Sequence, residues 1–177
     1  ELTQKGRLPH LDQPRQVADG AVLEIDMATR RNLEMTRTLS GDRAGSLLSS
    51  IDRTITGAGG RLLSAWLSAP LTNVAEINAR LDAVQYFCGD ASLRDRVREQ
   101  LSASADIERA LSRTSLGRGG PRDLAAIRDG LKVASKLQTL LQEQEPSKSA
   151  AAIIEAAKQL CEHATLIEWL DRALASD

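Results

Sequence analysis

Apolar residues recur along most of the chain at spacings of three and four, which is the repeat of an amphipathic α-helix. One narrow stripe comprises Val74, Ile77, Leu81, Val84 and Cys88. It follows Asn73, which stands three positions before Glu76 in a pattern typical of a helix N-terminus. The stripe therefore predicts a helix that packs against another helix.

Shorter elements are predicted before this helix. Ala21–Ile25 alternates weakly and could form a short strand, and Asp26 can cap a short helix over Ala28–Glu34. Leu39–Gly45 is expected to be a polar loop. A further helix, ended by Pro70, places on one face Leu62, Leu63, Trp66 and Leu67. Because Trp66 is large and shares this spacing, we expect it to lie in the core.

Two short helices are expected in the middle of the chain, one restarting at Ser92 and one over Asp106–Ser115. Pro121 then suits the first position of a long helix, where its missing N–H costs nothing. The apolar positions of that helix are Leu124, Ile127, Leu131, Ala134, Leu137 and Leu141. After a break at Glu145-Pro146-Ser147, a second long segment carries Ile153, Ala157, Leu160, Ala164, Ile167, Leu170 and Leu174. The two segments predict an antiparallel, lever-like helical hairpin.

The fold class expected from these patterns is mainly α: a multi-helix core domain with a long helical hairpin and at most one short N-terminal strand. Residues 1–20 contain two glycines and two prolines with little periodicity, so we interpret them as a linker from a preceding domain. Residues 21–177 form the expected core domain, with the hairpin over 121–177. The absence of an initiator Met suggests a piece of a longer protein.

Composition narrows the function. Hydrophobic residues make up 42% of the 177, but only 2% are aromatic, which suits packed helices better than sheets. Lys and Arg number 23 against 24 Asp and Glu, a balance that argues against broad attraction to nucleic acid or membranes. Cys88 and Cys161 occur without an apolar leader or a long apolar run. We therefore expect a reduced, soluble, cytoplasmic protein with no membrane contact.

Motifs for catalysis are missing. Gly57, Gly59 and Gly60 precede a helix but lack the Lys of a phosphate-binding loop, so we interpret them as a structural turn. Cys161 and His163 point to different sides of a helix, which favours a packed Cys and a solvated His over a metal site. The run with Arg94, Arg96 and Arg98 is interleaved with Asp95 and Glu99, which indicates a solvated face with local ion pairs. We expect no enzyme activity and no cofactor in this chain.

An ordered set of segments resembles the core domain of the MutS family of DNA mismatch repair proteins. The entry segment is Asp26-Met27-Ala28-Thr29-Arg30-Arg31-Asn32-Leu33-Glu34. The similarity continues through Leu48, Asp52-Arg53-Thr54, Gly59, Arg61, Leu62-Leu63, Trp66-Leu67, Pro70-Leu71, Arg80-Leu81-Asp82-Ala83-Val84, Asp106-Ile107-Glu108-Arg109, Ser112-Arg113 and Pro121-Arg122-Asp123-Leu124. Ala58 and Gly60 depart from the residues common in the family, and beyond about Leu131 only helical periodicity remains to compare.

The resemblance implies a parent protein that finds mispaired or looped DNA and signals repair with ATP. Mismatched DNA would bind through other domains, the parent would self-associate as a dimer, and a repair protein of the MutL type would act downstream. ATP and Mg would bind in an ATPase domain outside this chain. Phe87 lacks the family's wedge motif, since Cys88-Gly89 follows it. This chain would be the first part of the core and the ascending lever.

Seven residues are structural or interdomain candidates on this resemblance. They are Arg30, Arg31, Asn32, Glu34, Trp66, Arg122 and Asp123. Each also has a simpler reading as a residue that supports the fold, by a salt bridge or by packing. The alternative for the whole chain is a stand-alone helical adaptor that binds a partner protein through one apolar stripe.

Overall fold

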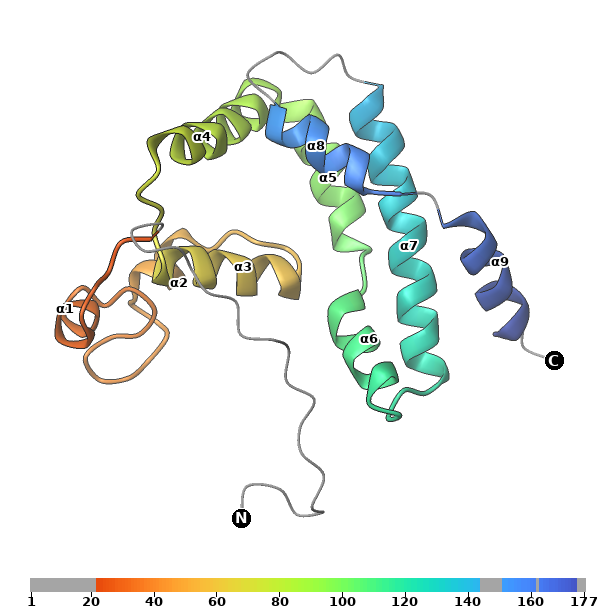
Figure 1. The fold of residues 1–177 in the computed structure, drawn as a ribbon, viewed down its shortest axis with the longest axis horizontal. Coiled ribbons are helices and arrows are strands. Elements are labelled where there is room, and N and C mark those ends of the chain that lie inside the picture. Colours follow the sequence, from red (N-terminus) through yellow and green to blue (C-terminus); the bar gives the residue numbers. More distant parts are fainter. Residues whose placement is uncertain (1–21, 144–150, 162, 175–177) are drawn as a thin grey trace.

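The computed structural model describes residues 22–143, 151–161 and 163–174, which form a chain of helices (Figure 1). The helices are α1 Met27–Asn32, α2 Leu47–Ile51, α3 Gly57–Ser68, α4 Val74–Gly89, α5 Ala91–Ser102, α6 Ile107–Ser115, α7 Pro121–Gln142, α8 Ala151–Gln159 and α9 Ala164–Ala173. The mainly α prediction is confirmed. The predicted linker over residues 1–20 and the break at Glu145-Pro146-Ser147 lie outside the described residues.

The expected strand is reduced to a single contact. Val22 and Leu71 form one isolated antiparallel bridge, in which the Leu23 N–H donates to the Pro70 carbonyl over 2.7 Å. No strand is formed within the described ranges. This bridge holds the entry segment beside the residues that follow α3.

Several helix starts follow from local capping chemistry. The Asp26 carboxylate accepts the N–H groups of Ala28 and Thr29, each over 2.9 Å, and Asn73 caps α4 in the same way. Pro121 is the first residue of α7, as predicted. The restart expected at Ser92 was placed too late, because Asp90 caps α5 through the Leu93 N–H at 2.9 Å. The glycines at 57, 59 and 60 form the first turn of α3 itself, capped by Thr56, rather than a turn before it.

The core lies around α7, which contacts α5 and α6 along one side and α8 and α9 elsewhere (Figure 1). Its buried apolar residues are Ile127, Val133, Leu137, Leu140 and Leu141. Ile127 packs with Ala110 of α6 and Leu170 of α9, so one cluster joins three helices. The predicted stripe of α7 is therefore confirmed as its packing face.

The predicted hairpin is wrong in its second arm. The segment from Ile153 to Leu174 is not one helix but two, α8 and α9, separated by residues around Cys161. α8 contacts both α7 and α4, whereas α9 packs mainly on α7. Leu170 of α9 packs with Ile127 near the start of α7, so the two halves of the segment contact different parts of the core.

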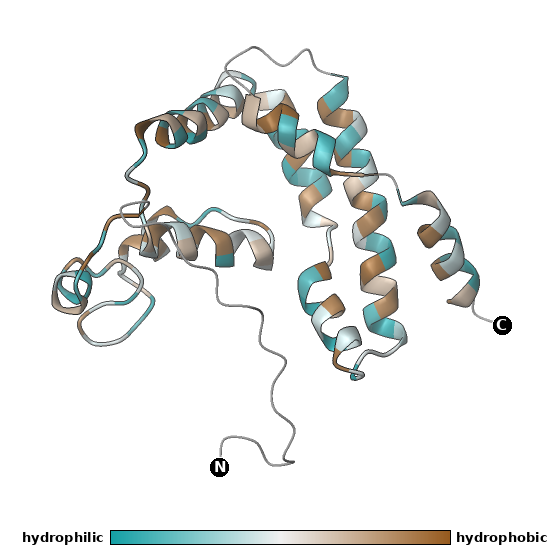
Figure 2. Ribbon diagram, viewed as in Figure 1, coloured by the Kyte–Doolittle hydropathy of each residue, from teal (hydrophilic) through white to brown (hydrophobic). Residues whose placement is uncertain are grey.

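The prediction that Trp66 lies in the core is also wrong. Trp66 is 42% exposed. Among the described helices, α3 packs mainly on the short α2. The Arg80 guanidinium carbon of α4 lies 3.9 Å from the centre of the Trp66 ring, a cation–π contact. In Figure 2, hydrophobic residues, coloured brown, occur along both α3 and α4.

The apolar stripe of α4 is also uncovered by the described residues, although it was expected to pack on a helix. Val74, Leu81 and Val84 are 68%, 59% and 59% exposed. The main helix partners of α4 are α5 and α8. Within the described part of the chain, no helix combines the length and hydrophobicity that a membrane span requires.

Candidate functional site

Arg61 joins the N-terminal helices to the α6–α7 body. Its guanidinium donates to both Asp106 carboxylate oxygens, over 2.9 and 2.8 Å, and to the Glu108 carboxylate over 2.6 and 3.2 Å. The two partners stand at the start of α6, 45 and 47 positions further along the chain. Such a fork-to-carboxylate pair fixes orientation as well as distance.

Asp106 has two structural roles at this junction. Its carboxylate accepts the Arg109 N–H over 3.3 Å as the N-cap of α6, and it lies close to the first turn of α3. A Cβ added at Gly57 would lie 3.0 Å from Asp106 Oδ2, so the glycine leaves room for this approach. The hydrogen bond from Arg61 lowers the pKa of Asp106 to about 2, with smaller contributions from the Arg109 N–H and from charge.

The same contacts raise the pKa of Arg61 above its ordinary value, first through the bond to Asp106 and then through Glu108. A second arginine adds to the connection, because Arg98 of α5 donates to the Arg53 carbonyl over 3.0 Å. The link between the α2–α3 region and the α5–α7 body is therefore polar and directional. Because salt screens exposed charges, this link should weaken as the ionic strength rises.

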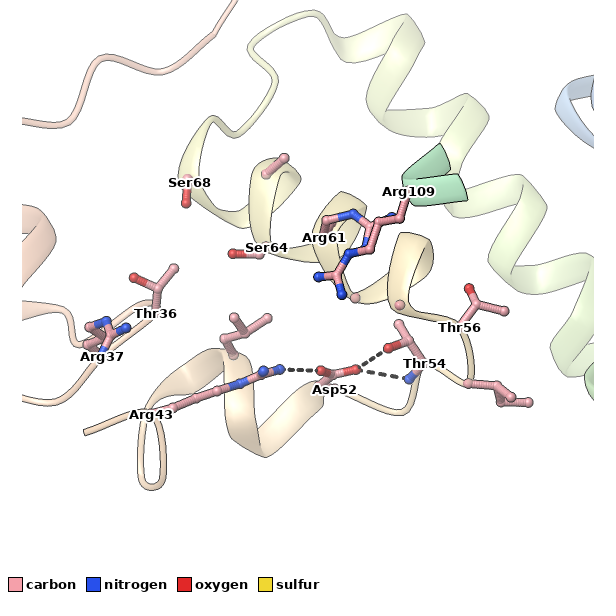
Figure 3. A pocket seen from close by; sticks show the side chains of 15 residues that line it. Thr36, Arg37, Arg43, Asp52, Thr54, Thr56, Arg61, Ser64, Ser68 and Arg109 are labelled. Atoms are coloured by element: carbon pink, nitrogen blue, oxygen red, sulfur yellow. Dashed lines mark hydrogen bonds and ion pairs between the residues drawn. The ribbon is translucent and has the colours of Figure 1, made fainter. Parts of the chain in front are cut away.

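A wide groove of about 850 Å³ opens beside Arg61, between the loop after α1, the α2–α3 connection, α3 and the start of α6 (Figure 3). Its charged lining residues are Arg37, Arg43, Asp52, Arg61 and Arg109. Its remaining lining is mostly hydroxyls and small residues. The groove is thus open, polar and predominantly basic.

Asp52 organises the wall of the groove opposite Arg61. It accepts from Arg43 over 2.7 Å, and from the Thr54 backbone N–H and hydroxyl over 2.9 and 2.7 Å (Figure 3). The pKa of Asp52 is lowered, chiefly by the Thr54 hydroxyl, then by the Thr54 N–H, with Arg43 contributing less. A charged carboxylate therefore holds the turn between α2 and α3.

The entry candidates lie around α1 and not in the groove. Arg31 and Asn32 are exposed, while Arg30 is half-buried and lines a separate hollow of about 570 Å³ with Asp26 and Ser68. Glu34 has a positive φ of 47°, and its carboxylate accepts the Leu39 N–H over 2.6 Å. Glu34 therefore shapes the loop before α2, whereas an interdomain role for all four residues stays a prediction.

Arg122 and Asp123 line the same hollow but differ in exposure. Asp123 is 7% exposed and accepts from the Gly120 N–H over 3.1 Å and from the Arg113 guanidinium, so it closes the turn between α6 and α7. Arg122 is exposed and borders a hollow of about 490 Å³ shared with Arg109 and Arg113. Trp66 lines none of these hollows.

Other residues with chemical potential are not assembled into a site. Cys161 is exposed and not packed as expected, because it lies in the connection between α8 and α9. One local ion pair expected in this run is confirmed, that of Arg94 with Asp95 at 3.7 Å, whereas Arg96 meets Glu143 of another segment at 3.5 Å. Among the described residues, no three His, Cys, Asp or Glu side chains gather as metal ligands would.

The sequence contained the members of the junction but not the pairing. Arg61 and Asp106 both belong to segments that carry the family resemblance, yet neither was singled out as a site residue. The usable signal was an arginine placed just after a glycine-rich helix start, where it can reach a carboxylate on another element. Only the three-dimensional arrangement identifies that carboxylate as Asp106.

These features define a helical scaffold whose parts are held in register by charged junctions. The chain belongs to the MutS domain III family, whose model matches residues 28–176. It is 51% identical, over its whole length, to the DNA mismatch repair protein MutS of Rhodopseudomonas palustris strain BisB5, of which it covers 19%. It is 57% identical over 77% of its length to the MutS protein of Caulobacter vibrioides, covering 15% of that protein. With the Paracoccus denitrificans protein, 48% identity extends over the whole chain and 20% of the relative.

The chain thus spans about a fifth of the length of the relatives that it matches over its whole length. It corresponds to domain III and not to an ATPase domain. Nothing in these comparisons favours the stand-alone adaptor.

Proposed function

We propose that this chain is the core and lever segment of a DNA mismatch repair protein, a connector between DNA-binding and ATPase parts that performs no catalysis itself. The observation that carries the proposal is the arrangement of α7, a helix of 22 residues supported along its length by α5, α6 and α9. At 1.5 Å per residue such a helix is about 33 Å long. A braced helix of this length can transmit a displacement between distant sites.

The contacts of Arg61 connect the lever to one defined part of the chain, the α2–α3 region. They fix the α2–α3 region to the N-terminus of α6, and α6 packs along α7. A movement imposed on α3 is therefore passed to the lever through Asp106. The roles expected of the longer protein follow from the family: binding of mispaired DNA, dimer formation, ATP and Mg in a separate domain, signalling to a MutL-type protein and a cytoplasmic location.

The proposal is tested in the full-length parent by softening α7 at exposed positions. Asp129→Gly and Lys136→Gly together remove no core side chain, but each places in the helix a glycine, whose helix propensity is about 1 kcal/mol less favourable than that of Ala and lower than that of Asp or Lys. We expect mismatch binding without nucleotide and ATPase activity without DNA to stay near wild type. ATP-driven release from mismatched DNA should slow.

The matched control places the same substitution at two exposed positions of α4, Glu76→Gly and Asp82→Gly. This variant loses comparable helix stability outside the lever, so its ATP-driven release should match wild type. Equal release kinetics for the α7 variant and the α4 variant would contradict the connector role.

A further inference from the structure

The groove beside Arg61 carries a local excess of positive charge. Four arginines and one aspartate line it, whereas the whole chain has 23 basic and 24 acidic residues. These arginines come from separate elements: Arg37 and Arg43 from the loop before α2, Arg61 from α3 and Arg109 from α6. A basic cluster assembled from distant segments is a property of the fold and not of one charged run.

The arginines on the α3–α6 side converge. Arg61 Nη1 and Arg109 Nε lie 2.9 and 3.5 Å from the same Asp106 oxygen, Oδ2. Figure 3 shows both side chains projecting over the groove, with Arg43 and Arg37 along the opposite side. A ligand in the groove would therefore meet guanidinium groups from two sides.

Two of these groups retain unused hydrogen-bonding capacity. Arg37 donates to the Gly41 carbonyl over 2.8 Å and has no carboxylate partner within the described residues. Among the described residues, the Arg109 guanidinium makes only the long 3.5 Å contact to an Asp106 oxygen that Arg61 already occupies. Since a guanidinium offers five N–H donors in a planar fork, both groups can still bind a carboxylate.

The floor of the groove allows close approach of a backbone. Gly57, Gly60, Ser64 and Ser68 follow one another along the same side of α3 and line the groove. These residues place little bulk above the helix, and the Thr36 hydroxyl lines the groove where it can bond a peptide group. An extended polypeptide with an acidic side chain fits this combination of shape and donors.

Nucleic acid fits the groove less well. Asp52 lines it, and Asp106 and Glu108 border Arg61, so a row of phosphates would face three carboxylates. Their charges offset most of the four arginines, and DNA binding depends on uncompensated cations. A single carboxylate needs only one guanidinium with unused N–H donors, such as that of Arg37 or Arg109. Ile55 offers an apolar contact that a polypeptide can use.

We propose that this groove docks an acidic segment of the polypeptide outside residues 1–177 of the same longer protein. The inference rests on the proposed function only in that the chain is one domain of such a protein. Relatives extend far beyond the matched region, of which the chain covers about a fifth. A segment tethered in the same molecule has a high effective concentration, so a few charge-assisted contacts suffice to hold it.

The test uses the full-length parent with a photo-crosslinking amino acid in place of Ser64, at the floor of the groove. Irradiation should attach an Asp- or Glu-containing peptide from outside residues 1–177, identified by mass spectrometry. The control position is Ser102, exposed at the end of α5, which should give no such product. Combining the probe with Arg37→Gln and Arg109→Gln should lower the crosslink yield about tenfold, because two charge-assisted contacts are lost.

Attachment to DNA, to a peptide without acidic residues or to nothing would overturn the proposal, as would a yield unchanged by the two arginine substitutions. An Arg118→Gln variant controls for loss of charge, because Arg118 is exposed in the α6–α7 turn and does not line the groove. Its crosslink yield should equal wild type. ATP-driven DNA release, measured separately, reports on the connector role, so failure of one proposal does not imply failure of the other.

Discussion

Ile107 occupies the space that a side chain at position 130 would need. A Cβ built on Gly130 would lie 2.3 Å from Ile107 Cγ1 and 2.4 Å from its Cδ1, far inside van der Waals contact. The absence of a side chain on α7 thus lets the first residue of α6 rest against the helix backbone. Because Asp106 directly precedes Ile107, this close contact also positions the carboxylate that Arg61 binds.

Gly130→Ala should therefore destabilise the fold. Alanine gains up to about 1 kcal/mol of helix propensity over glycine, but overpacking typically costs about 1–3 kcal/mol, and the β-branched Ile107 has little rotamer freedom to yield. We expect a net loss of about 1–2 kcal/mol by urea denaturation. Gly89→Ala is the control, since nothing lies within 4 Å of a Cβ there and it should be neutral or stabilising. Equal stability of the two variants would show that α6 does not depend on this contact.

The Arg61–Asp106 pair predicts a pH-dependent contribution to stability. The folded pKa of Asp106 is lowered to about 2 from an ordinary 3.8, so its contribution is present above pH 3.8 and is lost as the pH falls toward 2. Asp106→Asn keeps an N-cap side chain but loses the charge. We expect the variant to unfold at lower urea than wild type at pH 7, with the difference shrinking between pH 4 and pH 2. A difference that stays constant over this range would exclude the ionic contribution.

Trp66→Ala should cost much less than the truncation of a buried tryptophan. The indole is 42% exposed, and its contact with Arg80 is worth about 0.5–1 kcal/mol at an exposed site. Leu137→Ala, in the buried face of α7, should cost about 2–5 kcal/mol. Chemical denaturation of both variants measures this order. A larger loss for Trp66→Ala would mean that the indole is enclosed.

Local chemistry explains which parts of the fold the sequence predicted. Asp26, Asn73 and Pro121 act within a few residues of themselves, so the helix starts they define were recovered. Periodicity identified the apolar face of α4 but not whether this chain covers it, because a stripe specifies no partner. The break between α8 and α9 was missed because residues 160–163 contain neither Pro nor Gly to signal it.

The candidate site was less predictable than the helix starts, because the local pattern around a residue does not specify a distant partner. The partners Arg61 and Asp106 are 45 positions apart, and nothing in the local pattern of either residue selects the other. The entry residues Arg30 and Glu34 were found through resemblance, which identifies a segment but not its contacts. The structure assigns Glu34 to its own loop, through the Leu39 N–H.

DNA binding by this chain alone should be weak, salt-sensitive and indifferent to a mismatch. The chain has no net positive charge to release counterions, with 23 basic and 24 acidic residues, and its single Phe lies in α4 without the wedge motif. Fluorescence anisotropy with a G·T duplex and its homoduplex measures the preference at physiological salt. Several-fold tighter binding of the G·T duplex would contradict this expectation.

Self-association of the isolated chain is the expected consequence of its uncovered helices. On α4, the apolar side chains of Leu81 and Val84 lie one turn apart and are both 59% exposed, and Trp169 of α9 is 60% exposed. Large apolar patches tend to find a partner, and a helical stripe is suited to packing on a copy of itself. Sedimentation velocity should therefore show dimers whose fraction rises with concentration. Leu81→Lys combined with Val84→Lys should restore the monomer, because burying two unpaired ammonium groups costs more than the apolar contact returns. Leu116→Lys removes an equally exposed leucine from the α6–α7 turn and should leave the dimer intact. A chain that stays monomeric at every concentration would contradict this prediction and would show that the α4 stripe is tolerated in water.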